Sequence, residues 1–240
     1  MKATQLLWAV LALSPALALG DEVRGASSRT FYFEAKVSPY TPNIDSGYSA
    51  GTGPYAKSFG AGFMWLGEAE LDFQFFQKFG SLAIGLSAGY AEKYGKGVVV
   101  ATGQPSSEST ALHIVPIKAL LVYRFDWLNI KYDIPLVPYL KGGPVIMPWW
   151  VTKGPDIEVA DGLKAQGYKL GLSGTLGLAF CLDFLDRRLA RDFDTSMGVN
   201  HSYIFAEGTL QNMVLFEPAS NPKPLNLSSL HVMFGLGLEF

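Results

Sequence analysis

The stretch that decides the fold is the end of the chain, Leu230 to Phe240, which reads LHVMFGLGLEF. Every even position in it is large and apolar. The positions between them hold His231, Met233, Gly235, Gly237 and Glu239. Side chains of a β-strand point alternately to its two faces, so this alternation predicts a strand with one apolar face. Glycine and small residues on the other face suit the crowded interior of a narrow barrel.

The same period of two recurs along the chain, most clearly over residues 168–183, 31–38 and 65–75. Followed throughout, it predicts eight strands, at residues 30–38, 65–78, 81–91, 109–125, 134–149, 166–183, 197–208 and 228–240. A hairpin within the first long loop would raise the count to ten. The fifth strand has the weakest pattern, because its prolines lack a backbone donor and predict irregular pairing. These are Pro135, Pro138, Pro144 and Pro148.

The connections between these strands are expected to alternate in length. The first, third, fifth and seventh are long and rich in Gly, Pro, Ser and Asn, whereas those at 79–80, 126–133 and around 184–194 are shorter. Long outer loops, short periplasmic turns and an even strand count are typical of outer-membrane barrels. The sequence thus predicts an all-β fold, a closed antiparallel up-and-down transmembrane β-barrel.

Aromatic residues support this arrangement. The four tryptophans beyond residue 20 fall at or just past expected strand ends, as the interfacial girdles of a membrane barrel require, whereas the core of a soluble sandwich would place them mid-strand. They are Trp65, Trp127, Trp149 and Trp150.

The first twenty residues, MKATQLLWAVLALSPALALG, have the features of a secretory signal peptide: a lysine, a short apolar run and small residues before Asp21. Cleavage is expected after Gly20, with Ala18 as the alternative, leaving residues 21–240 as the barrel domain. Beyond this segment no apolar run reaches the length of a membrane-spanning helix. We expect export to the outer membrane of a Gram-negative bacterium.

Composition excludes several classes of function. The net charge is −2, with 19 Lys and Arg against 21 Asp and Glu, so nucleic acid is not an expected partner. One cysteine and three scattered histidines give no zinc-finger, CxxC or HExxH spacing, and no cofactor is expected. Asp156, Glu158 and Asp161 form a weak candidate for a divalent cation, although a solvated acidic loop is the simpler interpretation.

Charged residues of both signs are expected on the inward faces of the strands, because hydrocarbon would penalise each of them strongly. The set is Glu34, Lys36, Glu68, Glu70, Asp72, Lys118, Arg124, Lys141, Lys169, Asp183 and Glu239. An eight-stranded barrel is wide enough only for its own side chains. The prediction is therefore a packed, charge-paired interior without an aqueous pore.

The C-terminal strand, with Phe240 as its final residue, resembles the signal by which bacterial outer-membrane barrels are delivered to their insertion machinery. This resemblance implies that Phe234, Leu236, Leu238 and Phe240 carry an assembly signal. Residues 189–207, 136–144 and 225–240 are similar to an uncharacterised outer-membrane β-barrel family frequent in myxobacteria. That similarity implies fold and location, and no activity.

The expected function is non-enzymatic: a structural, adhesive or surface-recognition role carried by the outer loops of a monomer, with outer-membrane lipids and the barrel assembly machinery as partners. The first alternative is a transporter for small apolar molecules, which would need an apolar tunnel and a side opening. The only feature of the sequence that favours such an opening is the bend that the prolines of the fifth strand predict.

The second alternative is a lipid-modifying enzyme, because Asn200, His201, Ser202 and Glu207 invite comparison with lipid A deacylases. His201 and Ser202, however, are neighbours and point to opposite faces of a strand.

The segment that follows residue 184 has apolar residues at four-residue spacing, Leu185, Leu189 and Phe193, which predict a short amphipathic helix over the periplasmic rim.

Overall fold

The computed structural model describes residues 29–49, 51, 53–98, 105–160, 162–185, 187–216 and 225–240. The expected signal peptide, residues 1–20, lies outside them. The strands of the wall are β1 Phe31–Tyr40, β2 Met64–Gln77, β3 Ser81–Val98, β4 Pro105–Ile114, β5 Ile117–Arg124, β6 Leu136–Lys153, β10 Gln166–Cys181, β11 His201–Asn212 and β12 Ser229–Glu239.

The connections hold the remaining elements. Three short strands lie between β6 and β10: β7 Asp156–Ile157, β8 Val159–Ala160 and β9 Leu163–Lys164. The helical segments are η1 Asn43–Asp45, α2 Pro54–Phe59, α3 Trp127–Tyr132, η2 Leu182–Phe184 and α4 Arg187–Met197. None of these described helices is long and apolar enough to cross a bilayer.

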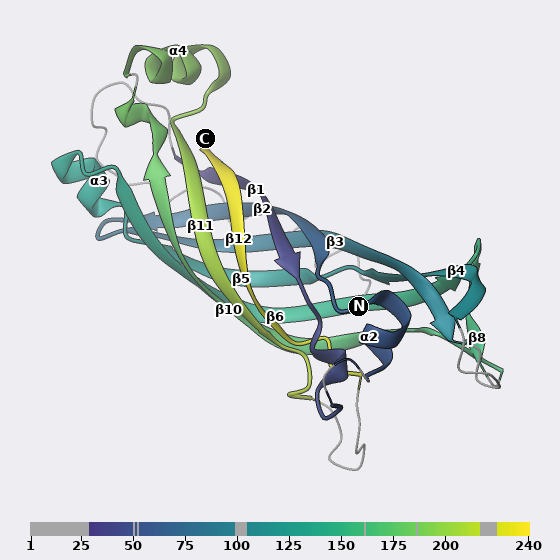
Figure 1. Cartoon of the computed structure of the whole chain (residues 1–240). Helices are drawn as coiled ribbons and strands as arrows, with labels where there is room; N and C mark the ends of the chain where they lie inside the picture. Colours follow the sequence, from purple (N-terminus) through teal and green to yellow (C-terminus); the bar gives the residue numbers. More distant parts are fainter. Residues whose placement is uncertain are drawn as a thin grey trace, which may run out of the picture.

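The strands form a closed antiparallel ring (Figure 1). β1 pairs with both β2 and β12, and β6 pairs with β10, which leads through β11 back to β12. β4 and β5 each pair with β3 and β6, so they are two parts of one strand, interrupted at Val115 and Pro116. The ring therefore has eight strands by this pairing, and the predicted fold class is confirmed. The hairpin considered for the first loop is not found, because the described residues of that loop form η1 and α2.

Burial alternates along the strands as the sequence pattern predicts. In β2, Leu71 and Phe73 are about half exposed, whereas Glu70 and Asp72 are buried. In β10 the even positions are outside, with Leu176 71% exposed, and the odd positions are inside. The barrel thus has an apolar exterior and a polar interior, which is the distribution that a membrane imposes.

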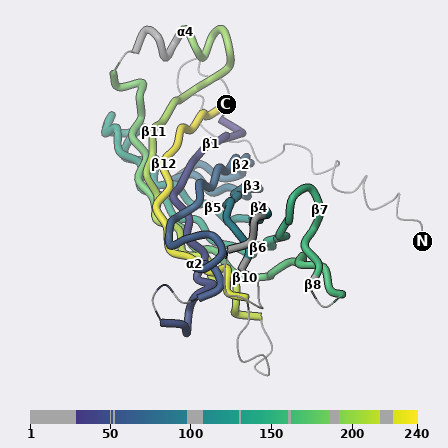
Figure 2. Tube along the Cα trace, turned by 45° about the vertical axis from the view of Figure 1, so that its right-hand side comes forward, coloured from purple at the N-terminus to yellow at the C-terminus, as the bar shows by residue number. Residues whose placement is uncertain are grey.

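The two ends of the barrel differ (Figures 1 and 2). One end holds α3, α4 and the C-terminus, and the other holds α2 and β7 to β9. We call these the periplasmic and the outer end. The outer connections are shorter than expected, because β3 and β4 continue to pair as far as Val98 and Pro105. The connection from Leu182 to Asn200, expected to be short, contains η2 and α4, so it is a helical segment at the rim.

β6 pairs with β10 without interruption, but its pairing with β4 and β5 has gaps at Gly143–Pro144 and at Met147–Pro148, so the predicted irregular pairing is found on one side of the strand. The side chains of its three prolines, Pro138, Pro144 and Pro148, all point to the outside of the barrel. The carbonyl oxygens of Pro138 and Pro148 accept hydrogen bonds from the backbone N–H groups of Phe125 and Val115. N–H and C=O of one residue point to the same neighbour in an antiparallel ladder, so the missing donors face β4 and β5. The irregular pairing therefore lies between β6 and that neighbouring strand, at Val115–Pro116 and at Ala119–Leu120.

Candidate functional site

The interior of the barrel contains a network of buried ions, which we call the lumen charge cluster. Its members are Glu34, Lys36, Glu70, Asp72, Arg124, Lys141 and Glu207. They come from β1, β2, β5, β6 and β11, so the network ties together strands from around the ring. All seven side chains are at most 7% exposed.

Two lysines organise the lumen charge cluster. Lys36 Nζ lies 2.5 Å from Glu70 Oε2 and 2.9 Å from Glu207 Oε1. Lys141 Nζ lies 2.5 Å from Glu34 Oε2 and 2.7 Å from Glu70 Oε1. Each ammonium group thus bridges carboxylates of different strands, as buried charges require to offset their desolvation.

Arg124 completes the lumen charge cluster on its periplasmic side. Its Nη2 donates to Glu34 Oε1 and to Asp72 Oδ2, each at 2.8 Å. The guanidinium carbon lies 3.3 Å from the centroid of the Tyr32 ring, a cation–π contact. Tyr139, whose hydroxyl donates to Glu207 Oε2 at 2.9 Å, packs against Phe205 in the same layer. Ions and rings together fill the cross-section here.

The other expected inward charges lie as follows. Lys118 Nζ is 2.7 Å from both Glu68 oxygens, and Glu239 accepts from Gln74 at 2.9 Å; all four side chains are buried. Lys169 is only half-buried. The prediction for Asp183 is wrong, because β10 ends at Cys181 and Asp183 lies in η2 at the periplasmic rim.

Two buried carboxylates were not in the expected set. Glu207 faces the lumen because β11 places its odd positions inside, where they include aromatic rings as well as polar groups. The pattern of polar and apolar residues was therefore ambiguous for this strand. Asp126 lies just beyond β5 and accepts a hydrogen bond from Ser81 Oγ. Burial raises the pKa of the Asp126 carboxyl.

Toward the outer end the lumen changes from charged to apolar. A cluster of buried side chains fills this half, and it is rich in methionine. It includes Met64, Leu66, Ile114, Met147, Met213, Leu227 and Met233. Methionine side chains are flexible and adapt to irregular space, so this half is more apolar and more deformable than the ionic half, and it also holds the buried polar side chains of Gln211, Ser229 and His231.

Outside the barrel, an aromatic girdle marks the outer edge of the apolar belt. Tyr90 Oη lies 2.8 Å from His113 Nδ1, and the His113 ring stacks on Trp150 at 5.0 Å between centroids. On β3 the outward residues Ile84 and Leu86 precede Tyr90. Amphipathic rings at this level are typical of the membrane–water interface.

The backbone pairing between β1 and β12 has a gap toward the outer end, which we call the side window. Their pairing ends at Val37 and Phe234, while β1 stays paired with β2 as far as Tyr40. Phe31 and Phe240 exchange backbone hydrogen bonds, so the odd positions of β1 direct their N–H groups to β12. Pro39 has no such group, and its missing donor therefore faces β12 just where the pairing stops. Above the gap the strands rejoin, since Asn43 N donates to Ser228 O at 2.9 Å.

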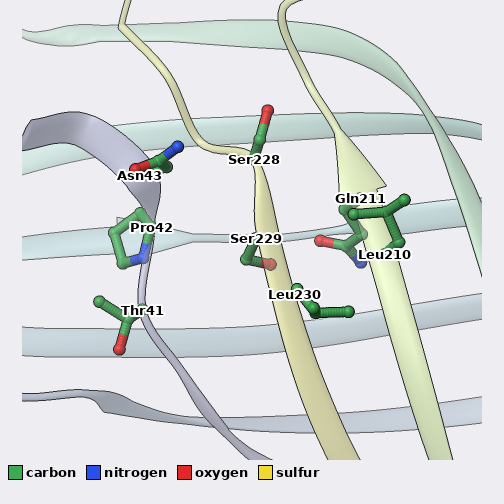
Figure 3. A pocket seen from close by; sticks show the side chains of 8 residues that line it. All are labelled: Thr41, Pro42, Asn43, Leu210, Gln211, Ser228, Ser229 and Leu230. Atoms are coloured by element: carbon green, nitrogen blue, oxygen red, sulfur yellow. The ribbon is translucent and has the colours of Figure 1, made fainter. Parts of the chain in front are cut away.

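A pocket of about 350 Å³ lies at this window (Figure 3). It is lined by Thr41, Pro42, Asn43, Leu210, Gln211, Ser228, Ser229 and Leu230. The Gln211 side chain is fully buried, and neither its amide oxygen nor its amide nitrogen has a partner among the described residues. A buried amide without partners is costly, so this position is suited to a ligand or water that hydrogen-bonds to it.

The residues considered for a deacylase are not brought together. His201 Nδ1 lies 2.6 Å from Asp183 Oδ2 at the periplasmic rim, whereas Glu207 lies within the lumen charge cluster. Ser202 uses its backbone N–H to donate to Asp183 Oδ1 at 3.2 Å.

Of the acidic loop residues considered for a cation, Asp161 lies outside the described residues. The predicted helix is present as α4.

The residues of the expected assembly signal lie along the closing strand. Phe234 and Leu236 are more than half exposed on the outer face, and Leu238 and Phe240 are half-buried. The Phe240 carbonyl oxygen accepts from the backbone N–H of Thr30 at 2.6 Å and of Phe31 at 3.0 Å. The last residue therefore takes part in closing the ring.

The sequence matches no protein-family model and no curated protein. Among solved structures, the attachment invasion locus protein Ail of Yersinia pestis is 11% identical, with 88% of this chain and 97% of that chain covered and a TM-score of 0.39. The outer-membrane protein OprG from Pseudomonas aeruginosa is 11% identical, with 91% and 99% covered and a TM-score of 0.47. The outer-membrane enzyme PagL is 12% identical, with 87% and 98% covered and a TM-score of 0.37. A likeness this distant transfers no role to the chain.

The class of protein follows from the fold itself. Only helices and closed barrels satisfy their backbone hydrogen bonds within a membrane. A closed antiparallel barrel with an apolar belt, an interfacial girdle and a charged interior is the architecture of the bacterial outer membrane. The chain is an outer-membrane β-barrel protein of the Gram-negative type.

Proposed function

We propose that this protein is a non-enzymatic, non-conducting barrel that presents a rigid recognition surface outside the cell. The observation that supports this most is the combination of a filled lumen with strands that extend beyond the girdle. β3 and β6 each have 18 residues, whereas a membrane-spanning strand needs roughly 9–11. Beyond Tyr90, the outward positions of β3 include Glu92 and Lys96, so the strand continues into water.

The outer end is held in place by specific contacts. Asp45 Oδ1 and Oδ2 accept from the backbone N–H groups of Tyr55 and Ala56 at 2.8 and 2.9 Å, which fixes the start of α2. Tyr55 Oη donates to Gly62 O at 2.9 Å, and burial raises its pKa to about 12. On the β8–β9 hairpin, Val159 and Leu163 are 57% and 75% exposed. Exposed apolar side chains on an ordered projection suit a protein partner.

The test replaces residues 154–165, which carry β7 to β9, by a short Gly-Ser turn. The pairing of β6 with β10 begins at Trp150 and Gln166, so the wall stays intact. Proteoliposomes with wild-type or shortened protein are probed against immobilised extracellular-matrix proteins and purified surface polysaccharides. Binding by the wild type that the shortened variant loses supports the proposal. No binding by either, or equal binding by both, contradicts it.

Several finer expectations belong to the same proposal. The protein acts as a monomer, its lipid partners cover the apolar belt, and the assembly machinery recognises Phe234, Leu236, Leu238 and Phe240. Membership of the myxobacterial family that the sequence resembles stays a prediction.

A second candidate function, binding or uptake of small apolar molecules, is favoured by the side window and by the apolar outer half of the lumen. The window lies at the level of the girdle, since Pro39 pairs with Trp65. Pro39→Val restores a donor toward β12 and should extend the pairing. If the window admits ligand, liposomes with the wild type should take up the fluorescent probe N-phenyl-1-naphthylamine faster than those with Pro39→Val. Equal rates would exclude this function.

A further inference from the structure

Three side chains of different chemistry meet at the periplasmic rim, and we call them the rim cluster: Cys181, Asp183 and His201. One ligand atom from each, Sγ, a carboxylate oxygen and a ring nitrogen, lies within 4.8 Å of the other two. The rim cluster is separate from the lumen charge cluster, and the function proposed above does not use it.

The backbone holds each member of the rim cluster in place. Cys181 is the last residue of β10 and donates its N–H to Pro135 O at 2.8 Å. His201 is the first residue of β11, the antiparallel neighbour of β10. Asp183 follows two residues after Cys181 in η2, and its Oδ1 accepts from the backbone N–H of Ser202 at 3.2 Å. The three side chains therefore converge because a hairpin of the wall ends here.

The donor set selects a class of metal. Thiolate, imidazole and carboxylate are the three ligand types that Zn²⁺ takes in proteins, whereas Ca²⁺ and Mg²⁺ prefer oxygen alone. A second group of possible ligands, Glu34, Glu70 and Asp72, contains only carboxylates and is already paired with Lys36, Lys141 and Arg124. The rim cluster is thus the better candidate of the two.

The geometry requires only a small adjustment to bind an ion. His201 Nδ1 and Asp183 Oδ2 share a hydrogen bond of 2.6 Å. Two bonds of about 2.0–2.1 Å at a tetrahedral angle would separate these atoms to roughly 3.3 Å. The ion would take the place of the shared proton, and the Cys181 thiol would lose its proton on binding.

Access also fits a small ion. The His201 and Asp183 side chains are 30% and 19% exposed, so the rim is open to the periplasm, while Cys181 is only 3% exposed. An ion or a small reagent can reach the thiol from this side, whereas a bulky molecule meets a buried sulfur.

We propose that the rim cluster binds one Zn²⁺-type ion through Cys181 Sγ, His201 Nδ1 and an Asp183 carboxylate oxygen, with a fourth position for solvent. Binding ties the end of β10, η2 and the start of β11 to one another. It would thereby fix the helical connection at the periplasmic mouth of the barrel.

The test uses the full mature protein, folded in detergent with reductant. Co²⁺ is titrated as the spectroscopic probe, and Zn²⁺ affinity is measured by competition with a chelating dye. We expect one ion per chain and a near-ultraviolet thiolate-to-cobalt charge-transfer band. Cys181→Ser should abolish the band. His201→Gln should weaken binding by at least the roughly 10- to 100-fold that loss of an outer partner costs. The control His113→Gln, at the other end of the barrel, should change neither.

A second measurement needs no variant. The chain has one cysteine, so alkylation of the native protein by a small reagent, iodoacetamide, reports on Cys181 alone. Zn²⁺ should slow this alkylation at least tenfold, and a chelator should restore it. Cobalt binding without a charge-transfer band, or an alkylation rate unchanged by Zn²⁺, would overturn the proposal.

Discussion

Lys141 on β6 donates to Glu34 on β1 at 2.5 Å, across the barrel and 107 residues apart in sequence. The same ammonium group lies 2.7 Å from Glu70 Oε1 and 3.6 Å from Glu207 Oε2. One side chain on the far wall thus contacts carboxylates of three strands, and all three carboxylates are buried.

Replacing Lys141 by Met should therefore destabilise the barrel strongly. Methionine keeps much of the volume but leaves buried carboxylates without their partner, which typically costs about 3 to 5 kcal/mol. Urea unfolding in lipid vesicles measures this. Lys153 is the matched control, because its pair with Glu108 is exposed on both sides, and Lys153→Met should leave the midpoint unchanged. A similar midpoint for both variants would mean that the network adds little to stability.

The filled lumen predicts negligible conductance for the wild-type protein. Ions of the lumen charge cluster and the rings of Tyr32 and Tyr139 occupy the cross-section, so no continuous water path is expected. Purified protein in planar bilayers should give no stable current steps, whereas a general porin in the same bilayers should. Large, long-lived channels would contradict a closed lumen.

The facing of β10 can be tested at two neighbouring residues. Leu176 is 71% exposed on the outer face, whereas Thr175 faces inward and its hydroxyl lies 2.9 Å from that of Thr209. Leu176→Arg should cost roughly 2 to 4 kcal/mol if it lies near the bilayer midplane, and Thr175→Ser much less. Folding equilibria in vesicles compare the two. A larger loss of stability for Thr175→Ser than for Leu176→Arg would mean that the even positions of β10 face the lumen and the odd positions face lipid.

The strands could be predicted because a membrane barrel enforces alternation wherever its wall meets lipid. β2 was expected at 65–78 and spans Met64–Gln77. The pattern fails beyond the girdle, where the outer face of a strand meets water instead of lipid and can carry charged residues such as Glu92 and Lys96. This is why β3 was expected to end at residue 91 although it continues to Val98.

The candidate sites were only partly predictable. The alternation of polar and apolar residues predicts that Glu34 and Lys141 point inward. In β11 the inward positions also include Tyr203 and Phe205, so the same alternation does not predict the direction of Glu207. The side window depends on the partner of Pro39, and the rim cluster depends on Cys181 and His201 meeting across a hairpin. Strand register and pairing depend on the tertiary structure and cannot be predicted from a single sequence.

The last residue should matter for assembly. Phe240 closes the ring through its backbone contacts with Thr30 and Phe31, and it ends the strand expected to carry the assembly signal. Deleting Phe240 should slow insertion by the assembly machinery, measured by pulse-labelling and the gel shift of the folded barrel. Spontaneous folding into synthetic vesicles is the control, since it needs no machinery and should slow much less. Insertion in cells at the wild-type rate would contradict an assembly role.

Two adjacent glycines in β6 should respond differently to the same substitution. A Cβ at Gly143 would collide with the backbone carbonyl of Ala119, on the neighbouring interrupted strand, whereas a Cβ at Gly142 would have Ser173 O as its nearest neighbour at 3.6 Å. Backbone cannot move aside as a side chain can, so Gly143→Ala should destabilise the barrel by about 1 to 3 kcal/mol, the usual cost of overpacking. Gly142→Ala should be nearly neutral, and both variants can be compared by urea titration in vesicles. If Gly143→Ala were as stable as Gly142→Ala, the close approach of β5 and β6 beside Pro144 would be wrong.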